Sequence, residues 1–165
     1  MKIIKKQSGS KKCFVCGVDN PVGLKLKFFE TDTDELTSTF NLPESYQGYT
    51  NRIHSGIITS ILDETILRAI KILEDDTNGV TMEIKVNFRR PVPVNTELTV
   101  LGRITSNSKL IFEGTSEIFE GDNVLALAEG KYMKVPEEEF TGIDTNNKWI
   151  KTEVNSNVIR DYKNK

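Results

Sequence analysis

One run of residues, from His54 to Leu73, has the spacing of a helix that is buried on most of its surface. Apolar or small residues recur along it in two neighbouring rows, at 57, 61, 65, 69 and 73 and at 58, 62, 66 and 70. At about 100° per residue, these rows cover a little over half of the helical circumference. We therefore expect one long helix with protein packed against most of its sides.

Two adjacent acids in this run fall on different faces of the predicted helix. Asp63 lies at the border of the apolar arc, where partial burial would raise its pKa and its basicity. Glu64 lies on the polar arc and pairs with Arg68 one turn later. Asp63 could be a local capping or pairing residue. The helix start favours a chemical role instead, because its free N–H groups, near Ser55 and Gly56, could stabilise an oxyanion.

Alternating apolar residues predict strands before and after the helix in the sequence. Residues 24–41 are predicted to form a hairpin, and further strands are expected at 80–88, 98–104, 110–119 and 124–135. The last three, joined by short turns, indicate an antiparallel meander. Gly79 is expected to end the helix in a left-handed conformation. A helix with so wide an apolar face needs a curved sheet around it and some further cover, which is an α+β arrangement. The edge of the sheet could bind a second copy that supplies the remaining cover.

The two ends of the chain differ in character from its middle. Residues 1–12 are basic, contain Gly and Ser and show no period, so we expect a flexible arm. Residues 136–165 are polar with few apolar anchors such as Trp149, so we expect an appendage that is partly docked or partly disordered. The predicted domain is therefore 13–135.

The charge and hydropathy of the chain exclude some classes of partner. The net charge is −2 at pH 7, and the 22 basic and 24 acidic residues are interspersed, which does not suit a nucleic acid or an anionic membrane surface. No apolar run approaches the length of about 18 residues that a membrane-spanning helix needs. The first residues also lack the apolar core of a signal peptide. We expect a cytoplasmic protein.

Cys13 and Cys16 have the spacing of half a zinc site. A second pair is missing from the sequence, and the single histidine, His54, is needed elsewhere. A redox motif is also open, but the βαβ context that usually follows one is absent. Structural packing is the favoured interpretation, and we expect no metal.

Several short motifs, taken together, resemble those of hotdog-fold acyl-CoA thioesterases, in the branch of the phenylacetate-pathway and mammalian mitochondrial enzymes. They are CFVCG at 13–17, NP at 20–21, GL at 23–24, YQG at 46–48, HSG at 54–56, LDE at 62–64 and FRRPVP at 88–93. The resemblance implies the hotdog fold, a curved antiparallel β-sheet wrapped around one long central helix. It also implies homodimers or dimers of dimers that act on acyl-CoA without a cofactor, since coenzyme A is part of the substrate.

The resemblance also assigns roles to residues. Asp63 takes the place of the catalytic carboxylate, and Ser55, with Gly56 beside it, that of the oxyanion-hole amide. The family usually has His-Gly-Gly, so the serine keeps the N–H but adds a side chain near the thioester carbonyl, which suggests an altered acyl preference. The motif includes His54 among the catalytic residues, although we favour a loop histidine that binds backbone and holds the turn.

Thr81 takes the place of a hydroxyl residue that positions water in some relatives. It has the opposite parity to the apolar residues of its strand, so it faces the helix only if the strand starts after it or bulges there. The candidate substrate-binding residues are Gln47, Arg89 and Arg90. The two arginines could meet the phosphates of coenzyme A or could simply be solvated.

We therefore predict an acyl-CoA thioester hydrolase in which Asp63 acts as general base or nucleophile. The alternative is a non-catalytic acyl-CoA-binding or sensing protein of the same fold, with Ser55 marking lost chemistry. A hydratase of this fold is a weaker option, because it would need an Asp–His pair and the single histidine lies in a loop.

Overall fold

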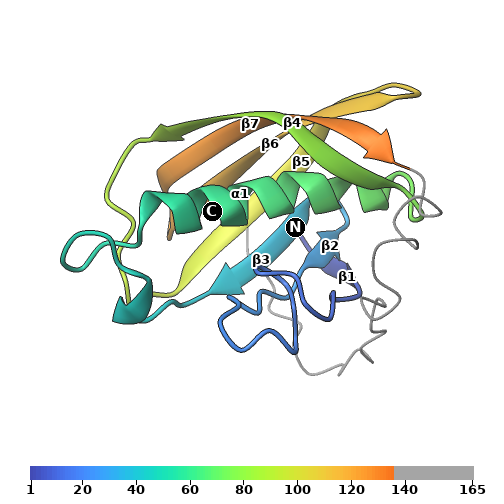
Figure 1. Cartoon of the computed structure of the whole chain (residues 1–165). Helices are drawn as coiled ribbons and strands as arrows, with labels where there is room; N and C mark the ends of the chain where they lie inside the picture. Colours follow the sequence, from blue (N-terminus) through green and yellow to red (C-terminus); the bar gives the residue numbers. More distant parts are fainter. Residues whose placement is uncertain (136–165) are drawn as a thin grey trace.

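In the computed structural model, which describes residues 1–135, a single antiparallel sheet curves around one helix (Figure 1). The strands are β1 (Ile3–Lys6), β2 (Phe29–Thr31), β3 (Leu36–Phe40), β4 (Asn78–Phe88), β5 (Leu98–Asn107), β6 (Ile111–Glu120) and β7 (Asn123–Val135). The helix α1 spans Ser55–Ala69 and continues as the 3-10 helix η2 (Ile70–Ile72), while a second 3-10 helix, η1 (Glu44–Tyr46), precedes it. The predicted α+β arrangement is confirmed. The predicted appendage at 136–165, including Trp149, lies outside the described residues.

The order of strands in the sheet is β1-β2-β3-β5-β6-β7-β4. The predicted meander is confirmed, since β5, β6 and β7 are neighbours. The chain enters α1 after β3 and returns as β4, which pairs antiparallel with β7. Within the described part of the chain, β4 is therefore an edge strand of 11 residues whose second edge has no strand beside it.

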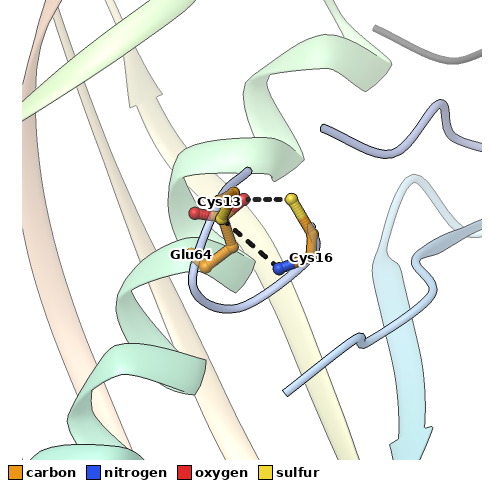
Figure 2. Close-up of side chains that lie close together, drawn as sticks. All are labelled: Cys13, Cys16 and Glu64. Atoms are coloured by element: carbon orange, nitrogen blue, oxygen red, sulfur yellow. Dashed lines mark hydrogen bonds between the residues drawn. The ribbon is translucent and has the colours of Figure 1, made fainter. Parts of the chain in front are cut away.

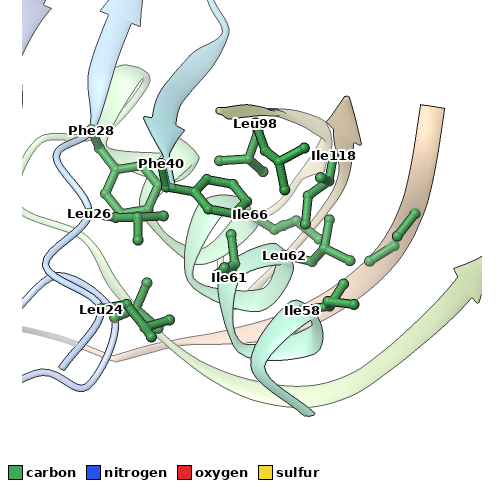
Figure 3. Packing of buried hydrophobic residues seen from close by; sticks show 14 of the residues in the cluster. Leu24, Leu26, Phe28, Phe40, Ile58, Ile61, Leu62, Ile66, Leu98 and Ile118 are labelled. Carbon is green, nitrogen blue, oxygen red and sulfur yellow. The ribbon is translucent and has the colours of Figure 1, made fainter. Parts of the chain in front are cut away.

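The hydrophobic core lies between α1 and the sheet, as the two predicted rows of the helix require. Figure 3 shows Ile61, Leu62 and Ile66 of α1 packed among side chains of the sheet, including Leu98 and Ile118. Full burial of an aliphatic side chain of this size contributes about 1.5–3 kcal/mol. The helix approaches β5 closely, because a Cβ atom on Gly102 would lie only 2.6 Å from Cγ2 of Thr65.

The prediction of a flexible arm at residues 1–12 is wrong. Residues 3–6 form β1, which pairs with β2, and the backbone N–H of Gln7 donates to the carbonyl of Phe28 at 3.0 Å. Gln7 and Ser10 are buried. The basic composition misled the prediction, because the pairing partner lies more than twenty residues away in the sequence.

The predicted hairpin is correct only in its second half. Leu24, Leu26 and Phe28 are buried, as their alternation with lysines predicts, but β2 begins at Phe29. The N–H groups of Leu24 and Leu26 donate to carbonyls in the Cys13–Cys16 turn rather than to a neighbouring strand. Lys25 has a φ of 58°, a left-handed conformation that interrupts a regular strand.

Gly79 does not end the helix. The helical segment is complete at Ile72, and Gly79 lies inside β4 with a negative φ. A Cβ atom at this position would lie 2.7 Å from Cζ of Phe112, so the glycine is required by close packing against the ring. Among the described residues, no helix combines the length and the apolarity that crossing a membrane would require.

Candidate active site

Hydroxyl groups from two strands hold the carboxylate of Asp63 on α1. Thr81 on β4 donates to its Oδ1 at 3.1 Å and lies 3.3 Å from its Oδ2. Tyr132 on β7 donates to Oδ1 at 2.9 Å. Thr81 and Tyr132 are paired opposite each other in the β4–β7 ladder, so the sheet presents both hydroxyls to one point on the helix. A carboxylate with fixed orientation is the result.

A bulge in β4 turns Thr81 toward the helix. Met82 has no partner in β7 between the pairs Thr81–Tyr132 and Glu83–Lys131. One extra residue reverses the alternation of side chains. Ile84 and Val86 therefore pack against the core after the bulge, and Thr81 faces inward before it. The sequence left two ways for Thr81 to face inward, a bulge or a strand that starts after it, and the structure has the bulge.

The electrostatic setting of Asp63 agrees with the prediction of partial burial. Desolvation raises the pKa of its carboxyl group above the ordinary value, and the hydrogen bonds from Tyr132 and Thr81 oppose part of that rise. Desolvation also raises the pKa of Tyr132, with the charge of Asp63 as a further cause, so its phenol stays protonated and donates. Asp63 is therefore more basic than an ordinary carboxylate, and it still accepts hydrogen bonds from both Thr81 and Tyr132.

Tyr132 is a site residue that the sequence did not reveal. It is fully buried, and its ring stacks on Phe112 with centroids 4.9 Å apart and an angle of 8° between the planes. Alternation along β7 places Tyr132 on the inner face. Its contact with Asp63, 69 positions away, depends on strand register, for which a single sequence carries no direct signal.

The start of α1 lies on the surface and carries the second predicted group. His54 is the N-cap residue, and its Nδ1 accepts a hydrogen bond from the N–H of Gly56 at 2.9 Å. The favoured interpretation of His54, a loop histidine that binds backbone, is confirmed by this contact, and a part in the reaction stays a prediction. Because the Gly56 N–H is used by His54, the Ser55 N–H is the better candidate for an oxyanion donor.

One chain does not bring the two groups together. Ser55 and Asp63 are eight positions apart on one helix, which is about 12 Å along its axis. Thr81 and Tyr132 join Asp63, whereas His54 and Gly56 stay with Ser55.

The three candidate substrate-binding residues lie in segments near the start of α1, where Ser55 is, and not beside Asp63. Gln47 forms an isolated bridge with Ile53, and its Oε1 accepts the N–H of Asn51 at 3.3 Å. Arg89 and Arg90 are exposed where β4 ends. That segment leads to Val92, whose carbonyl accepts the N–H of Ile53 at 2.8 Å.

The polar arc of α1, which carries Glu64 and Arg68, is covered by protein. Arg68 is 1% exposed, and its guanidinium donates to Gln7, to Cys16 and to the carbonyl of Ser8. Glu64 lies 3.7 Å from it as the expected i, i+4 partner. The segment before the hairpin folds over this face of α1 and buries it.

The same face of α1 brings Glu64 to the two cysteines (Figure 2). The sulfur atoms of Cys13 and Cys16 and a carboxylate oxygen of Glu64 all lie within 4.8 Å of one another. Both cysteines are free thiols. Among residues 1–135, these three side chains are the group that could hold a metal ion.

Comparison with known proteins finds relatives for the central part of the chain. Residues 50–127 match the sequence pattern of the thioesterase superfamily. A mitochondrial protein of Candida albicans without assigned function is 26% identical over 118 residues, which cover 68% of this chain and 53% of the relative. The chain thus matches about half the length of that protein. A protein of Saccharolobus solfataricus whose name proposes an esterase is 27% identical over 115 residues, covering 69% of this chain and 75% of the relative.

Solved structures share the fold. The PaaI protein of the E. coli phenylacetic acid degradation operon superposes with a TM-score of 0.61 over 68% of this chain and 80% of that chain, at 18% identity. At this identity the likeness shows a common architecture. Residues 50–127 therefore match the thioesterase superfamily, and the chain has the hotdog fold.

Proposed function

We propose that this protein hydrolyses acyl-CoA thioesters, with Asp63 as the group that activates the attacking water. The match of residues 50–127 to the thioesterase superfamily supports a thioester hydrolase, and the Saccharolobus relative supports a hydrolase more generally. The observation that carries the proposal is the half-buried Asp63 carboxylate, oriented by Thr81 and Tyr132. Such a carboxylate is basic enough to take a proton from water near neutral pH.

In the reaction that we propose, Asp63 removes a proton from a water molecule as that water attacks the thioester carbonyl. The Thr81 hydroxyl donates to Asp63, which leaves its oxygen free to accept a hydrogen bond from the water and position it. The carbonyl oxygen becomes an oxyanion and binds the N–H of Ser55 at a helix start, where the helix dipole adds to the attraction. The carbon–sulfur bond then breaks, and the proton held by Asp63 passes to the departing coenzyme A thiolate. Direct attack by Asp63 as a nucleophile is the other route to the same products.

The site that we propose is formed by two subunits. The attacking water must lie about 3 Å from the carbonyl carbon, so Asp63 and the Ser55 N–H of one helix are too far apart to act on the same thioester. A two-fold dimer with antiparallel helices would place Asp63 of one chain opposite the helix start of the other.

Among residues 1–135, one edge of β4 has no strand beside it, and this edge supports such a dimer. Val80 and Met82 on this strand are 44% and 55% exposed, because the bulge that turns Thr81 inward turns them outward. A long edge strand with exposed apolar side chains is an aggregation hazard unless another strand covers it. A second copy paired along β4 would cover the edge, and two such dimers could form a tetramer.

Coenzyme A would bind at the helix start in this arrangement. Arg89 and Arg90 are exposed there and carry the positive charge that its phosphates need. Gln47 lies in the loop that leads into the helix and would contact the acyl end of the substrate. The chemistry that we propose needs no further cofactor. We also propose the cytoplasm as the compartment, and fractionation of cells of the source organism tests this.

A non-catalytic acyl-CoA-binding protein is the second candidate. The observation that favours it is Ser55, whose exposed side chain stands beside the amide that would bind the oxyanion. An aromatic or branched acyl group would be affected by this side chain more than a short linear one.

Thiol release from a panel of acyl-CoA substrates separates the two candidates. We expect turnover of at least one member among short, medium, long and aryl acyl chains. Calorimetric titration of the same panel into the Asp63→Asn variant measures binding without turnover. Binding by the wild-type protein with no thiol release across the panel would reject the hydrolase and leave the binding protein.

A further inference from the structure

The CFVCG motif has no part in the proposed reaction, and its turn packs against Glu64, on a different face of α1 from Asp63. Figure 2 shows the turn beside Glu64. The sulfur of Cys16 lies 3.2 Å from Oε1 of Glu64. The sulfur of Cys13 completes a set of three donor atoms that all lie within 4.8 Å of one another. The sequence supplies only two of these ligands by spacing, and the fold adds the third.

The spacing of the three donors suits one tetrahedral ion. With Zn–S near 2.3 Å and Zn–O near 2.0 Å, tetrahedral angles put a sulfur and an oxygen about 3.5 Å apart and two sulfurs about 3.8 Å apart. The measured separation between the Cys16 sulfur and the Glu64 oxygen is 3.2 Å. This separation is within a few tenths of an ångström of the tetrahedral value, and the two separations that involve the Cys13 sulfur are at most 4.8 Å.

The backbone of the turn is arranged to stabilise a thiolate. The N–H groups of Val15 and Cys16 both donate to the sulfur of Cys13 at 3.3 Å. Gly17 follows, and its N–H donates to the Cys13 carbonyl at 2.8 Å. A Cβ atom at Gly17 would lie 2.3 Å from that carbonyl oxygen, so the turn requires a glycine at this position.

The buried Arg68 supplies an outer contact and balances the charge. Its Nη1 lies 3.3 Å from the Cys16 sulfur and 3.7 Å from Oε1 of Glu64. With both thiols deprotonated, Cys13, Cys16 and Glu64 carry three negative charges and Arg68 one positive charge. A divalent cation would bring this partly buried cluster to neutrality, which lowers the cost of placing these charges away from water. Outer hydrogen bonds to ligating sulfur are a usual feature of such sites.

We propose that Cys13, Cys16 and Glu64 bind a zinc ion, with a water molecule as the fourth ligand. Two thiolates select a borderline-soft metal such as zinc over magnesium or calcium. Binding releases the two thiol protons, and no oxidant is involved. The ion would link the turn at 13–17 to Glu64 of α1, the residue next to Asp63. This site does not rest on the proposed hydrolysis, so either can fail without the other.

The test is the metal content and cobalt spectrum of the purified full-length protein, kept reduced and free of chelator. We expect one zinc per chain by elemental analysis. Replacement by Co²⁺ should give the thiolate-to-cobalt charge-transfer absorption and the intense d–d bands of a tetrahedral sulfur site. Cys16→Ser should lose the metal, and Glu64→Gln, which keeps the size of the side chain, should weaken zinc binding by about 100-fold or more.

Asp63→Asn is the matched control, because it neutralises the neighbouring acid on the other face of the helix. It should retain full zinc binding. Several results would overturn the proposal: no zinc uptake by the reduced wild-type protein, full affinity in Glu64→Gln, or zinc retained after both cysteines are changed to serine. A Cys13–Cys16 disulfide that persists under reductant and excess zinc would also overturn it. Zinc uptake by the wild-type protein tests the proposal without any variant, so the test still stands if a variant does not fold.

Discussion

Tyr132→Phe removes one oxygen atom from the proposed site and little else. The ring that stacks on Phe112 stays, and so does Thr81 as the other donor to Asp63. The change deletes the 2.9 Å hydrogen bond to Oδ1 of Asp63 and a longer one, of 3.3 Å, to the Asp63 backbone carbonyl. The variant therefore isolates the effect of one donor on the carboxylate.

The direction of the effect follows from which form of Asp63 the phenol stabilises. A hydrogen bond to a charged group contributes about 1.5–3 kcal/mol, and about 1.4 kcal/mol corresponds to one pKa unit. Losing the donor destabilises the carboxylate relative to the neutral carboxyl group, so the pKa of Asp63 rises. Asp63 is only half-buried, and water can replace part of the lost bond. We therefore expect a rise of about one unit rather than two.

The assay is the pH profile of kcat/KM for thioester hydrolysis. A general base works only when deprotonated, so activity falls as the pH drops through the pKa of Asp63. In Tyr132→Phe this acidic limb should move to higher pH by about one unit, with the plateau above it reduced only a few-fold. Tyr49→Phe, at an exposed tyrosine, is the matched control and should leave the limb in place. An unchanged limb, or one moved to lower pH, would show that Tyr132 does not tune the catalytic base.

Three further predictions concern the base, the dimer and the domain boundary. Asp63→Asn should keep substrate affinity and lose about 10²–10⁴-fold in turnover; an intact rate would exclude it as base or nucleophile. Val80→Lys with Met82→Lys should give a monomer by sedimentation and lose activity, whereas Leu110→Lys, at an exposed apolar residue away from β4, should do neither. The truncated chain 1–135 should fold, dimerise and hydrolyse thioester, and its aggregation would show that the boundary is misplaced.

Patterns that repeat within a few residues could be predicted from the sequence. The two apolar rows of α1 are a local period, and they correctly placed Ile58, Ile61, Leu62 and Ile66 in the core. The same rows placed Asp63 at the edge of the buried arc, where its pKa is raised. The long alternating strands after the helix were also identified, because each buries one face against the same core.

Contacts between distant segments could not be predicted in this way. Arg68 lies on the polar side of the helix. It is buried only because the segment with Gln7 and Ser8 folds over it. Tyr132 reaches Asp63 through the register of β4 on β7. Cys13 and Cys16 show half of a ligand set, and Glu64 joins them only in three dimensions. In each case the sequence gives the residue type and the fold supplies its partner.

The most direct test of the central claim, an active site shared by two subunits, is complementation between two inactive variants. Asp63→Ala removes the carboxylate. Ser55→Pro removes the proposed oxyanion donor at the first residue of α1, where proline is tolerated. His54 has φ −60° and ψ 136°, the extended conformation that suits a residue before proline. Each variant alone should therefore fold and be nearly inactive.

The measurement is the thioesterase activity of the two variants refolded together in equal amounts. Random pairing makes about half of the dimers mixed, and each mixed dimer has one intact site and one site with both defects. A shared site predicts recovery of about a quarter of wild-type activity by this count. If each site lay within one chain, every site would keep one defect, and a mixture as inactive as its parents would contradict the account.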